Sequence, residues 1–386
     1  MLRDKYNRQL YTYILPPDLL EPPPGQEHHF LKPYSIVSLP EPAYAVAIHP
    51  SFSLTAPEQC LYLSSIRDMP IRLLSPFASG LLASYPLVSE QTERWTTPNS
   101  LLFHPRDLNT FFAGGIGTVS LFDINRNGEP PYHQIMRPPI RSITRQMKVL
   151  ASMANQSEDN GQDNWHLKGI VSAMDMNCDG LLAAGTFSKR LAILDPTSSV
   201  DAVGKLPLPQ DEGTGVTGLK FHPSPSRCNY LVVGSRRSTV LHVFDIRSPG
   251  SVMATLTDRI SATPQRLEFD VTSDGKVWAG CTDGKLRVWD ELGLKVGDVS
   301  PTWEQESQRD TVAAVQMHPG GAPVMATCGG ASSPRLAERE QSVPVHQSNL
   351  DAKESDQNEC ERTIRCETDT HSTLEVWQIS HDQEPY

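Results

Sequence analysis

The sequence lacks the motifs by which most enzymes are recognised. It contains no phosphate-binding loop, no serine nucleophile elbow and no His-Glu-x-x-His motif. The glycine-rich stretch at residues 113–118 lies between two expected strands instead of opening a helix, so we interpret it as a β-turn. We therefore predict a protein without catalytic activity and without a cofactor.

Long apolar runs and an excess of basic charge are also absent. No run approaches the roughly 18 apolar residues that a membrane span needs, and no signal peptide is evident, so we expect an intracellular protein that binds no membrane. The chain has 34 Lys and Arg against 45 Asp and Glu, a net charge of −11. Because phosphate affinity comes mainly from Lys and Arg, we expect no DNA binding, whereas a local basic patch stays compatible with RNA.

Cysteine is sparse, with seven scattered residues. Four lie in or beside expected strands: Cys178, Cys228, Cys281 and Cys328. We interpret these as small apolar residues with reduced thiols. Cys360 and Cys366 precede His371, but their spacing fits none of the usual zinc sites and a second ligand pair is missing. We predict no metal site.

What the sequence does contain is one cassette repeated six times. Each copy has an apolar strand, a turn that is often His-Pro or Asp-Gly, a small-residue strand with a tight turn, and an apolar strand that closes on Asp. The copies cover residues 46–74, 100–124, 170–195, 216–247, 265–290 and 312–331. Repeats of about 40–45 residues of this kind are typical of four-stranded propeller blades. We predict an all-β, WD40-type β-propeller over residues 1–386, with six recognisable blades plus a partial first blade.

Three segments depart from the repeat. Residues 1–20 read as a blade's last strand with a proline-rich exit, so we interpret them as a remnant of the first blade. Residues 141–168 are polar, and we expect an inter-blade loop there. Residues 332–372 are acidic and poor in aromatic residues, which predicts a disordered insert in the last blade. We expect residues 373–380 to complete that blade as its closing strand.

Two residue types recur at equivalent turns. A closing Asp can accept backbone N–H bonds in the turn that follows it, and each repeated His precedes Pro in the first turn. Because histidines spread around a ring cannot converge on one metal, we interpret both sets as structural. The residues are Asp123, Asp195, Asp245, Asp290, His49, His104, His222 and His318.

The turns between second and third strands gather on one face of a propeller, and here they are rich in arginine. Clustered Arg beside an aromatic ring suits phosphate contact plus base stacking, the usual way of holding single-stranded RNA. Ordinary solvated turn residues are the alternative, since charged turns are common on propellers. The candidate RNA-binding residues are Arg67, Arg72, Phe187, Lys189, Arg190, Arg236 and Arg237.

Several of these segments also carry a resemblance. "CLYLSSIRDMPIRLL", "NSLLFHPRDLNTFFAGGIGTVSLFD" and "GVTGLKFHPSPSRCNYLVVGSRRSTVLHVFDIR" resemble, in this order, the telomerase Cajal body protein family. The resemblance implies a seven-bladed nuclear propeller that binds small non-coding RNAs, with fungal relatives linked to pre-mRNA splicing. The chain departs from the family in having little of the first blade, and in Leu74-Ser75 where Trp-Asp is expected.

We therefore predict a non-catalytic scaffold. It is expected to bind small nuclear or small Cajal-body-type RNA together with ribonucleoprotein proteins, aiding their biogenesis, localisation and pre-mRNA splicing. We expect a monomer in the nucleus, including nuclear bodies, and also in the cytoplasm. The alternative is a protein–protein adaptor or substrate receptor without direct RNA contact. A catalytic propeller would need titratable residues lining its channel, where the first strands offer chiefly Ala, Leu, Met and Val.

Overall fold

The alternating cassettes form antiparallel strands, as their period of two predicts. The computed structural model describes residues 2–4, 8–15, 32–78, 80–89, 92–135, 167–197, 202–209, 213–308, 310–330, 360–368 and 372–379. In those ranges the regular structure is strand, apart from 3₁₀ turns at Pro57–Gln59 and Pro225–Arg227. No helix within them is long and apolar enough to cross a membrane.

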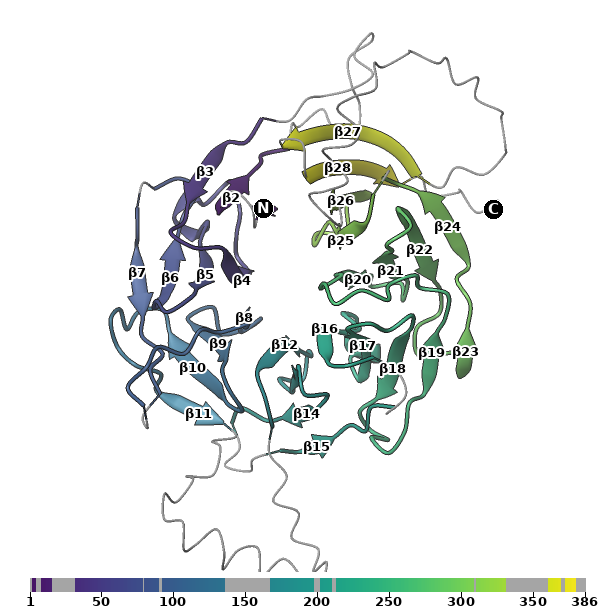
Figure 1. Ribbon diagram of the computed structural model, residues 1–386, viewed down its shortest axis with the longest axis horizontal. Helices are drawn as coiled ribbons and strands as arrows, with labels where there is room; N and C mark the ends of the chain where they lie inside the picture. The colour runs from purple at the N-terminus through teal and green to yellow at the C-terminus, as the bar shows by residue number, and fades with distance from the viewer. Residues whose placement is uncertain are drawn as a thin grey trace, which may run out of the picture.

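Six blades follow one another around the propeller axis (Figure 1). Blade 1 contains β4 (Ala43–Ile48), β5 (Tyr62–Ile66), β6 (Ile71–Leu74) and β7 (Ala83–Tyr85). Blade 2 contains β8 (Ser100–Phe103), β9 (Thr110–Gly114), β10 (Val119–Asp123) and β11 (His133–Ile135). Blade 3 contains β12 (Val171–Met176), β13 (Leu182–Thr186), β14 (Leu191–Leu194) and β15 (Gly204–Lys205). Blade 4 contains β16 (Val216–Phe221), β17 (Tyr230–Ser235), β18 (Leu241–Asp245) and β19 (Ala254–Leu256). In each of these blades the first strand is innermost.

The last two blades depart from simple chain order. Blade 5 contains β20 (Phe269–Val271), β21 (Val277–Gly280), β22 (Lys285–Trp289) and β24 (Trp303–Glu306). Between its last two strands, β23 (Gly297–Val299) crosses to blade 4 and pairs in parallel with β19. Blade 6 has the spatial order β25 (Val312–Met317), β26 (Val324–Gly330), β28 (Ser372–Ile379) and β27 (Cys360–Thr368).

A three-stranded sheet lies between blade 6 and blade 1 (Figure 1). Its strands are β1 (Leu2–Asp4), β2 (Gln9–Thr12) and β3 (Ser35–Ser38), with β2 in the middle. Leu10 packs with Tyr62 and Ile66 of blade 1, while Tyr13 packs against Val376 of blade 6. The predicted β-propeller of six blades plus a partial blade is confirmed.

Each blade buries both of its faces against its neighbours. Phe111 and Phe112 are consecutive on β9, point to opposite faces and are both fully buried. Phe111 joins a core with Leu63 and Tyr85 of blade 1, and Phe112 joins a core with Leu182 of blade 3. The inter-blade cores are therefore the hydrophobic cores of this protein, as expected for a repeat whose single unit cannot bury its own faces.

The small residues of the second strands have a steric cause. A Cβ at Gly185, in β13, would lie 2.5 Å from Cγ1 of Val216 in the next blade's innermost strand. A Cβ at Gly280, in β21, would lie 2.4 Å from the carbonyl oxygen of Val312. Real Cβ atoms do not come so close, so glycine allows adjacent blades to approach at this level.

Part of the insert in blade 6 is ordered. We predicted disorder over residues 332–372, and this is wrong for Cys360–Thr368, which form β27. That strand pairs with β28 along its whole length, from Cys360 opposite Ile379 to Thr368 opposite Ser372. The alternating run "CERTIRCET" is short, and the acidic composition of the long insert masks it. The other residues of the insert, and most of the expected loop at 141–168, lie outside the described residues.

The His-Pro turns share one hydrogen bond. In each of the four, Nδ1 of the histidine accepts the backbone N–H of the residue two positions later; the donors are Ser51, Arg106, Ser224 and Gly320. Burial lowers the pKa of His104 and of His222 below the usual value. A neutral imidazole therefore belongs to the folded state of the turns at His104 and His222.

The closing aspartates form similar turns. Oδ1 of Asp123, Asp195 and Asp245 accepts the backbone N–H two residues later, at 2.9, 2.9 and 3.0 Å respectively. Asp290 differs, because its Oδ1 is buried without a hydrogen-bond partner. Glu291 follows it with a φ of +63°, so the chain turns away at this point.

These histidines predict how stability depends on pH. The folded-state pKa of His104 and His222 lies below the unfolded value, so their contribution is complete above about pH 6.5 and is lost as the pH falls through the folded-state pKa. We expect His104→Asn with His222→Asn, whose amide oxygen can still accept the turn hydrogen bond, to lose less stability on acidification than the native chain.

Urea unfolding at about pH 7.5 and about pH 5.5 measures this difference. The exposed His133, changed to Asn, is the matched control and should leave the pH dependence unaltered. Equal losses in the double variant and the native chain would contradict the role of the neutral imidazoles.

Candidate nucleic-acid interface

The connections between second and third strands leave the blades at the same end, because every innermost strand runs in the same direction along the axis. We call this end the turn face. Its turns cover residues 67–70, 115–118, 187–190, 236–240 and 281–284. The connections from one blade to the next lie at the same end, so they also contribute side chains to the turn face.

Each of these turns contains a residue in the left-handed region. The φ angles are +52° at Asp68, +70° at Gly117, +61° at Lys189, +56° at Arg237 and +79° at Gly284. For a residue with a Cβ, this conformation costs about 1–2 kcal/mol. Two of the three strained positions carry a candidate RNA-binding cation, and such strain clusters at functional sites.

The centre of the site is a stacked pair from adjacent blades. Cζ of Arg236, in the β17–β18 turn, lies 4.5 Å from the ring centroid of Phe187, in the β13–β14 turn. The connection between these blades runs between the two turns. Its Gly213 carbonyl accepts a hydrogen bond from Nζ of Lys189 at 3.1 Å, and its Gly215 carbonyl accepts the Arg236 backbone N–H at 2.8 Å.

Within the described residues, no ion pair forms to Arg190, Arg236 or Arg237. Arg190 and Arg237 are exposed, while Arg236 is half-buried and its Nε is buried without a hydrogen-bond partner. Three guanidinium groups on neighbouring turns are therefore available to bind an anionic ligand.

The structure brings together five of the seven candidates and separates two. Arg67 and Arg72 belong to blade 1, with all of blade 2 between them and the stacked pair (Figure 1). Arg67 is exposed, with Nε 3.5 Å from the carboxylate of Asp68. Arg72 is half-buried on β6 and donates a hydrogen bond to Sδ of Met69. The turn of blade 2, residues 115–118, contains no basic residue.

The stack of Arg236 on Phe187 differs from the role that we predicted for Phe187. We predicted that its ring is available to a base, but the Arg236 guanidinium covers one face of it. The guanidinium plane is itself a platform on which RNA bases stack. In this structure the Phe187 ring contacts the Arg236 guanidinium instead of being free on both faces.

Sequence reasoning missed Arg266, in the connection from blade 4 to blade 5. Its Nη2 donates hydrogen bonds to the carbonyl oxygens of Ser172, in blade 3, and Asn99, just before blade 2. Arg266 thus reaches across the propeller axis on the turn face. A contact between residues so far apart in the chain leaves no signal in a repeat pattern.

A second missed group lies on the innermost strands, which are not as apolar as expected. Nζ of Lys220, on β16, is 3.4 Å from Oδ1 of Asp270 on β20, and Asp175 lies on β12 of the preceding blade. Oδ2 of Asp175 accepts the backbone N–H of Phe221, and Oδ2 of Asp270 accepts that of Met317. Each carboxylate thus joins its own innermost strand to the next one.

One ammonium, that of Lys220, lies between two carboxylates in this group. Burial raises the pKa of Asp175 to about 6, with Lys220 and the Phe221 N–H opposing the shift. Burial lowers the pKa of Lys220, but Asp270 and Asp175 outweigh it, so the net shift is upward. The geometry is that of a structural ionic layer around the axis.

The chain is similar in sequence to several known proteins. The chain is 27% identical over 335 residues to telomerase Cajal body protein 1 of Mesocricetus auratus, and 24% identical over 327 residues to the homolog of that protein in Drosophila melanogaster. The resemblance to the telomerase Cajal body protein family is confirmed. The two matches cover 86% and 83% of this chain but 56% and 53% of those relatives, so the chain spans about half their length.

The chain is also similar to a fungal protein with a different name. The chain is 28% identical over 293 residues to guanine nucleotide-binding protein negative regulator 1 of Schizosaccharomyces pombe, covering 75% of this chain and 66% of that protein. No protein-family model matches the chain. Among solved structures, the computationally designed protein Ika8 superposes with a TM-score of 0.47 at 16% identity, over 75% of this chain and 69% of that one.

The left-handed turn residues give a test that separates charge from backbone strain. Arg237→Gly removes the cation and the strain together, whereas Arg237→Ala removes the cation alone. We expect the Gly variant to be more stable than the Ala variant by about 1 kcal/mol, because only glycine adopts φ of +56° without steric cost.

Urea unfolding of both variants measures this difference. The exposed Arg190, which has no positive φ, is the control position, where Ala should be at least as stable as Gly. If Ala and Gly are equal at residue 237, the turn is not strained.

Proposed function

We propose that this protein is a non-catalytic scaffold that binds small nuclear or small Cajal-body-type RNA through the turn face of blades 3 and 4. The observation that carries the proposal is the Arg236–Phe187 stack, flanked by Lys189, Arg190 and Arg237 on adjacent turns. The name of the animal relatives, telomerase Cajal body protein 1, supports a ribonucleoprotein role in the nucleus.

The mode of binding follows from the side chains. Arg190 and Arg237 contact phosphates, and the plane of Arg236 receives an unstacked base. Because Phe187 already holds Arg236 in place, little side-chain freedom is lost when RNA binds. The chain as a whole carries a charge of −11, so affinity for RNA is confined to this patch and favours exposed single-stranded loops over long duplexes.

In the cell, the scaffold joins a small RNA to the proteins of its ribonucleoprotein, and so assists assembly, localisation and pre-mRNA splicing. We assign no reaction to it. The titratable groups around the axis, Asp175, Lys220 and Asp270, are engaged with one another and with backbone amides.

A second candidate is a protein–protein adaptor without direct RNA contact. The fission yeast relative supports it, because its name describes a negative regulator of a guanine nucleotide-binding protein. In that case the arginines of the turn face would bind acidic side chains of a partner protein.

The deciding experiment is ultraviolet crosslinking of the protein to RNA in its native cells, followed by sequencing. We expect small nuclear RNAs to be enriched, and Arg236→Glu with Arg237→Glu to reduce their recovery to background. The thermal unfolding temperature of this variant should fall only slightly, because Arg237 is exposed and Arg236 loses its stack on Phe187 but no ion pair within the described residues.

The matched control is Arg106→Glu with Arg126→Glu. It makes the same change in net charge at exposed positions in the β8–β9 and β10–β11 turns, on the opposite face. RNA recovery should be unaffected. If both double variants lose RNA equally, the effect is one of total charge and the turn face is wrongly assigned. If folded native protein recovers no RNA, the adaptor is the better proposal.

Salt dependence of binding to the recovered RNA gives a separate check. The two phosphate contacts of Arg190 and Arg237 to a single strand predict a slope of about −1.4 in a plot of log affinity against log salt concentration. Arg237→Gly should make that slope shallower by about 0.7, the share of one contact. A slope near zero would contradict phosphate recognition by this patch.

A further inference from the structure

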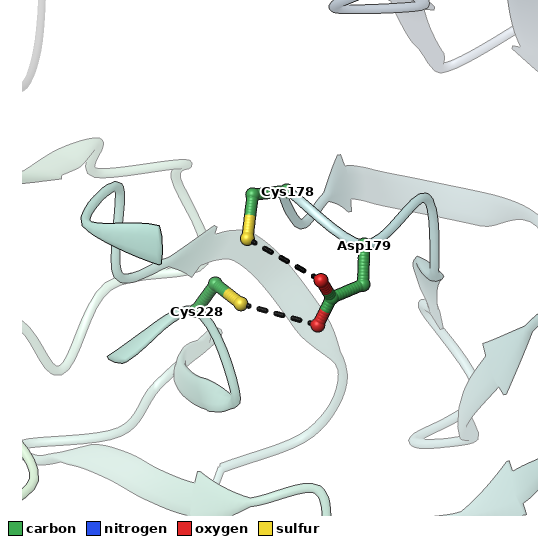
Figure 2. Close-up of side chains that lie close together, drawn as sticks. All are labelled: Cys178, Asp179 and Cys228. Atoms are coloured by element: carbon green, nitrogen blue, oxygen red, sulfur yellow. Dashed lines mark hydrogen bonds between the residues drawn. The ribbon is translucent and has the colours of Figure 1, made fainter. Parts of the chain in front are cut away.

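Two cysteines and an aspartate from adjacent blades meet on the face opposite the turn face. Cys178 and Asp179 lie in the turn between β12 and β13, and Cys228 lies just before β17. Their sulfur and carboxylate oxygen atoms all lie within 4.8 Å of one another (Figure 2). Among the described residues, this is the group whose donor atoms converge as metal ligands do.

The distances fit a tetrahedral metal site. Sγ of Cys228 is 3.3 Å from Oδ2 of Asp179, and Sγ of Cys178 is 3.7 Å from Oδ1 of the same carboxylate (Figure 2). With the usual Zn–S and Zn–O bond lengths, a tetrahedral zinc ion separates a thiolate sulfur from a carboxylate oxygen by about 3.6 Å. The three ligands therefore need only small movements to surround a zinc ion.

The turn that carries two of the ligands is already rigid. Oδ1 of Asn177 accepts the backbone N–H groups of Asp179 at 3.0 Å and Leu181 at 2.8 Å, and Asn177 is buried. Its Nδ2 donates to the carbonyl oxygen of Cys228 at 3.4 Å, which joins the turn to the neighbouring blade. The ligands are held in place before any metal arrives.

The environment of the thiols also differs from that of buried apolar cysteines. Cys228 is almost fully buried, yet its thiol donates to a carboxylate, and Cys178 is half-buried beside an exposed Asp179. Two thiols beside one carboxylate offer both soft and hard donor atoms to a divalent cation such as zinc.

We propose that Cys178, Cys228 and Asp179 bind one zinc ion, with the fourth position open to solvent. Two thiolates select zinc over magnesium or calcium. The ion joins the first turns of blades 3 and 4, and so braces from the opposite face the two blades that carry the Arg236–Phe187 stack. The proposal does not depend on RNA binding.

Zinc content of the full chain, purified with reduced thiols and dialysed against zinc buffer, tests the proposal. We expect about one zinc per chain that Cys178→Ser with Cys228→Ser removes. Cys60→Ser is the matched control, because a serine hydroxyl can replace the bonds from the Cys60 thiol to the carbonyl oxygens of Ser53 and Ala56, and it should keep the zinc.

Cobalt substitution of the native chain tests the ligands without any variant. We expect the near-ultraviolet charge-transfer bands of cobalt–thiolate bonds and the intense visible bands of a tetrahedral ion. Asp179→Asn should weaken zinc affinity at least tenfold while leaving the thiols in place. Zinc should also raise the unfolding temperature of the native chain and not that of the double serine variant.

Three results would overturn the proposal. One is cobalt spectra without thiolate bands. Another is zinc that persists unchanged in the double serine variant, which would assign it to other residues such as Cys360 and Cys366. The third is a disulfide between Cys178 and Cys228 in zinc-free protein isolated from cells.

Discussion

The close approach of one blade to the next is the constraint on which the rest of this structure depends. A four-stranded blade exposes apolar side chains on both faces, and each face is buried only when a neighbour covers it. Phe111 and Phe112 show this directly, since adjacent residues serve two different cores. In β13 and β21 the contact is close enough to need glycine, because Gly185 and Gly280 meet Val216 and Val312 of the next blade.

The candidate RNA site is a product of the same contact. Phe187 comes two residues after Gly185, and a Cβ at Gly215 would lie 2.4 Å from the carbonyl oxygen of Phe187. The inter-blade connection is thus wedged between neighbouring turns, and this brings Arg236 over the Phe187 ring. A site on loops gains its precision here from backbone packing, because the loops lie directly on the ends of rigid strands.

Sequence reasoning succeeds where the information is periodic. The repeat predicts the blades, the turns and the face on which Lys189, Arg190, Arg236 and Arg237 lie, because all of these follow from the position of a residue within its cassette. It fails where the outcome depends on the distance between cassettes. Position within the cassette alone groups Arg67 with Arg236, although blades 2 and 3 lie between them.

The repeat pattern also fails to predict other features, some because they are contacts between cassettes and one for a local reason. The stack of Arg236 on Phe187, the reach of Arg266 across the axis and the meeting of Cys178 with Cys228 are contacts between cassettes. Strand β27 escapes for a local reason, since nine residues with a strand pattern are diluted by an acidic insert. The resemblance to the telomerase Cajal body protein family supports the proposed functional class, about which the cassette alone says nothing.

The strand order of blade 6 has a consequence for how the protein folds during its synthesis. Its third position is filled by β28, which follows β27 in the chain and is separated from β26 by the long insert. During synthesis, five whole blades and three of the four strands of the sixth therefore leave the ribosome before residues 372–379. Until then the ring stays open, with β26 lacking a partner on one side and Tyr13 lacking Val376. In this state the chain exposes an unpaired strand edge and apolar side chains, the features that make folding intermediates prone to aggregation.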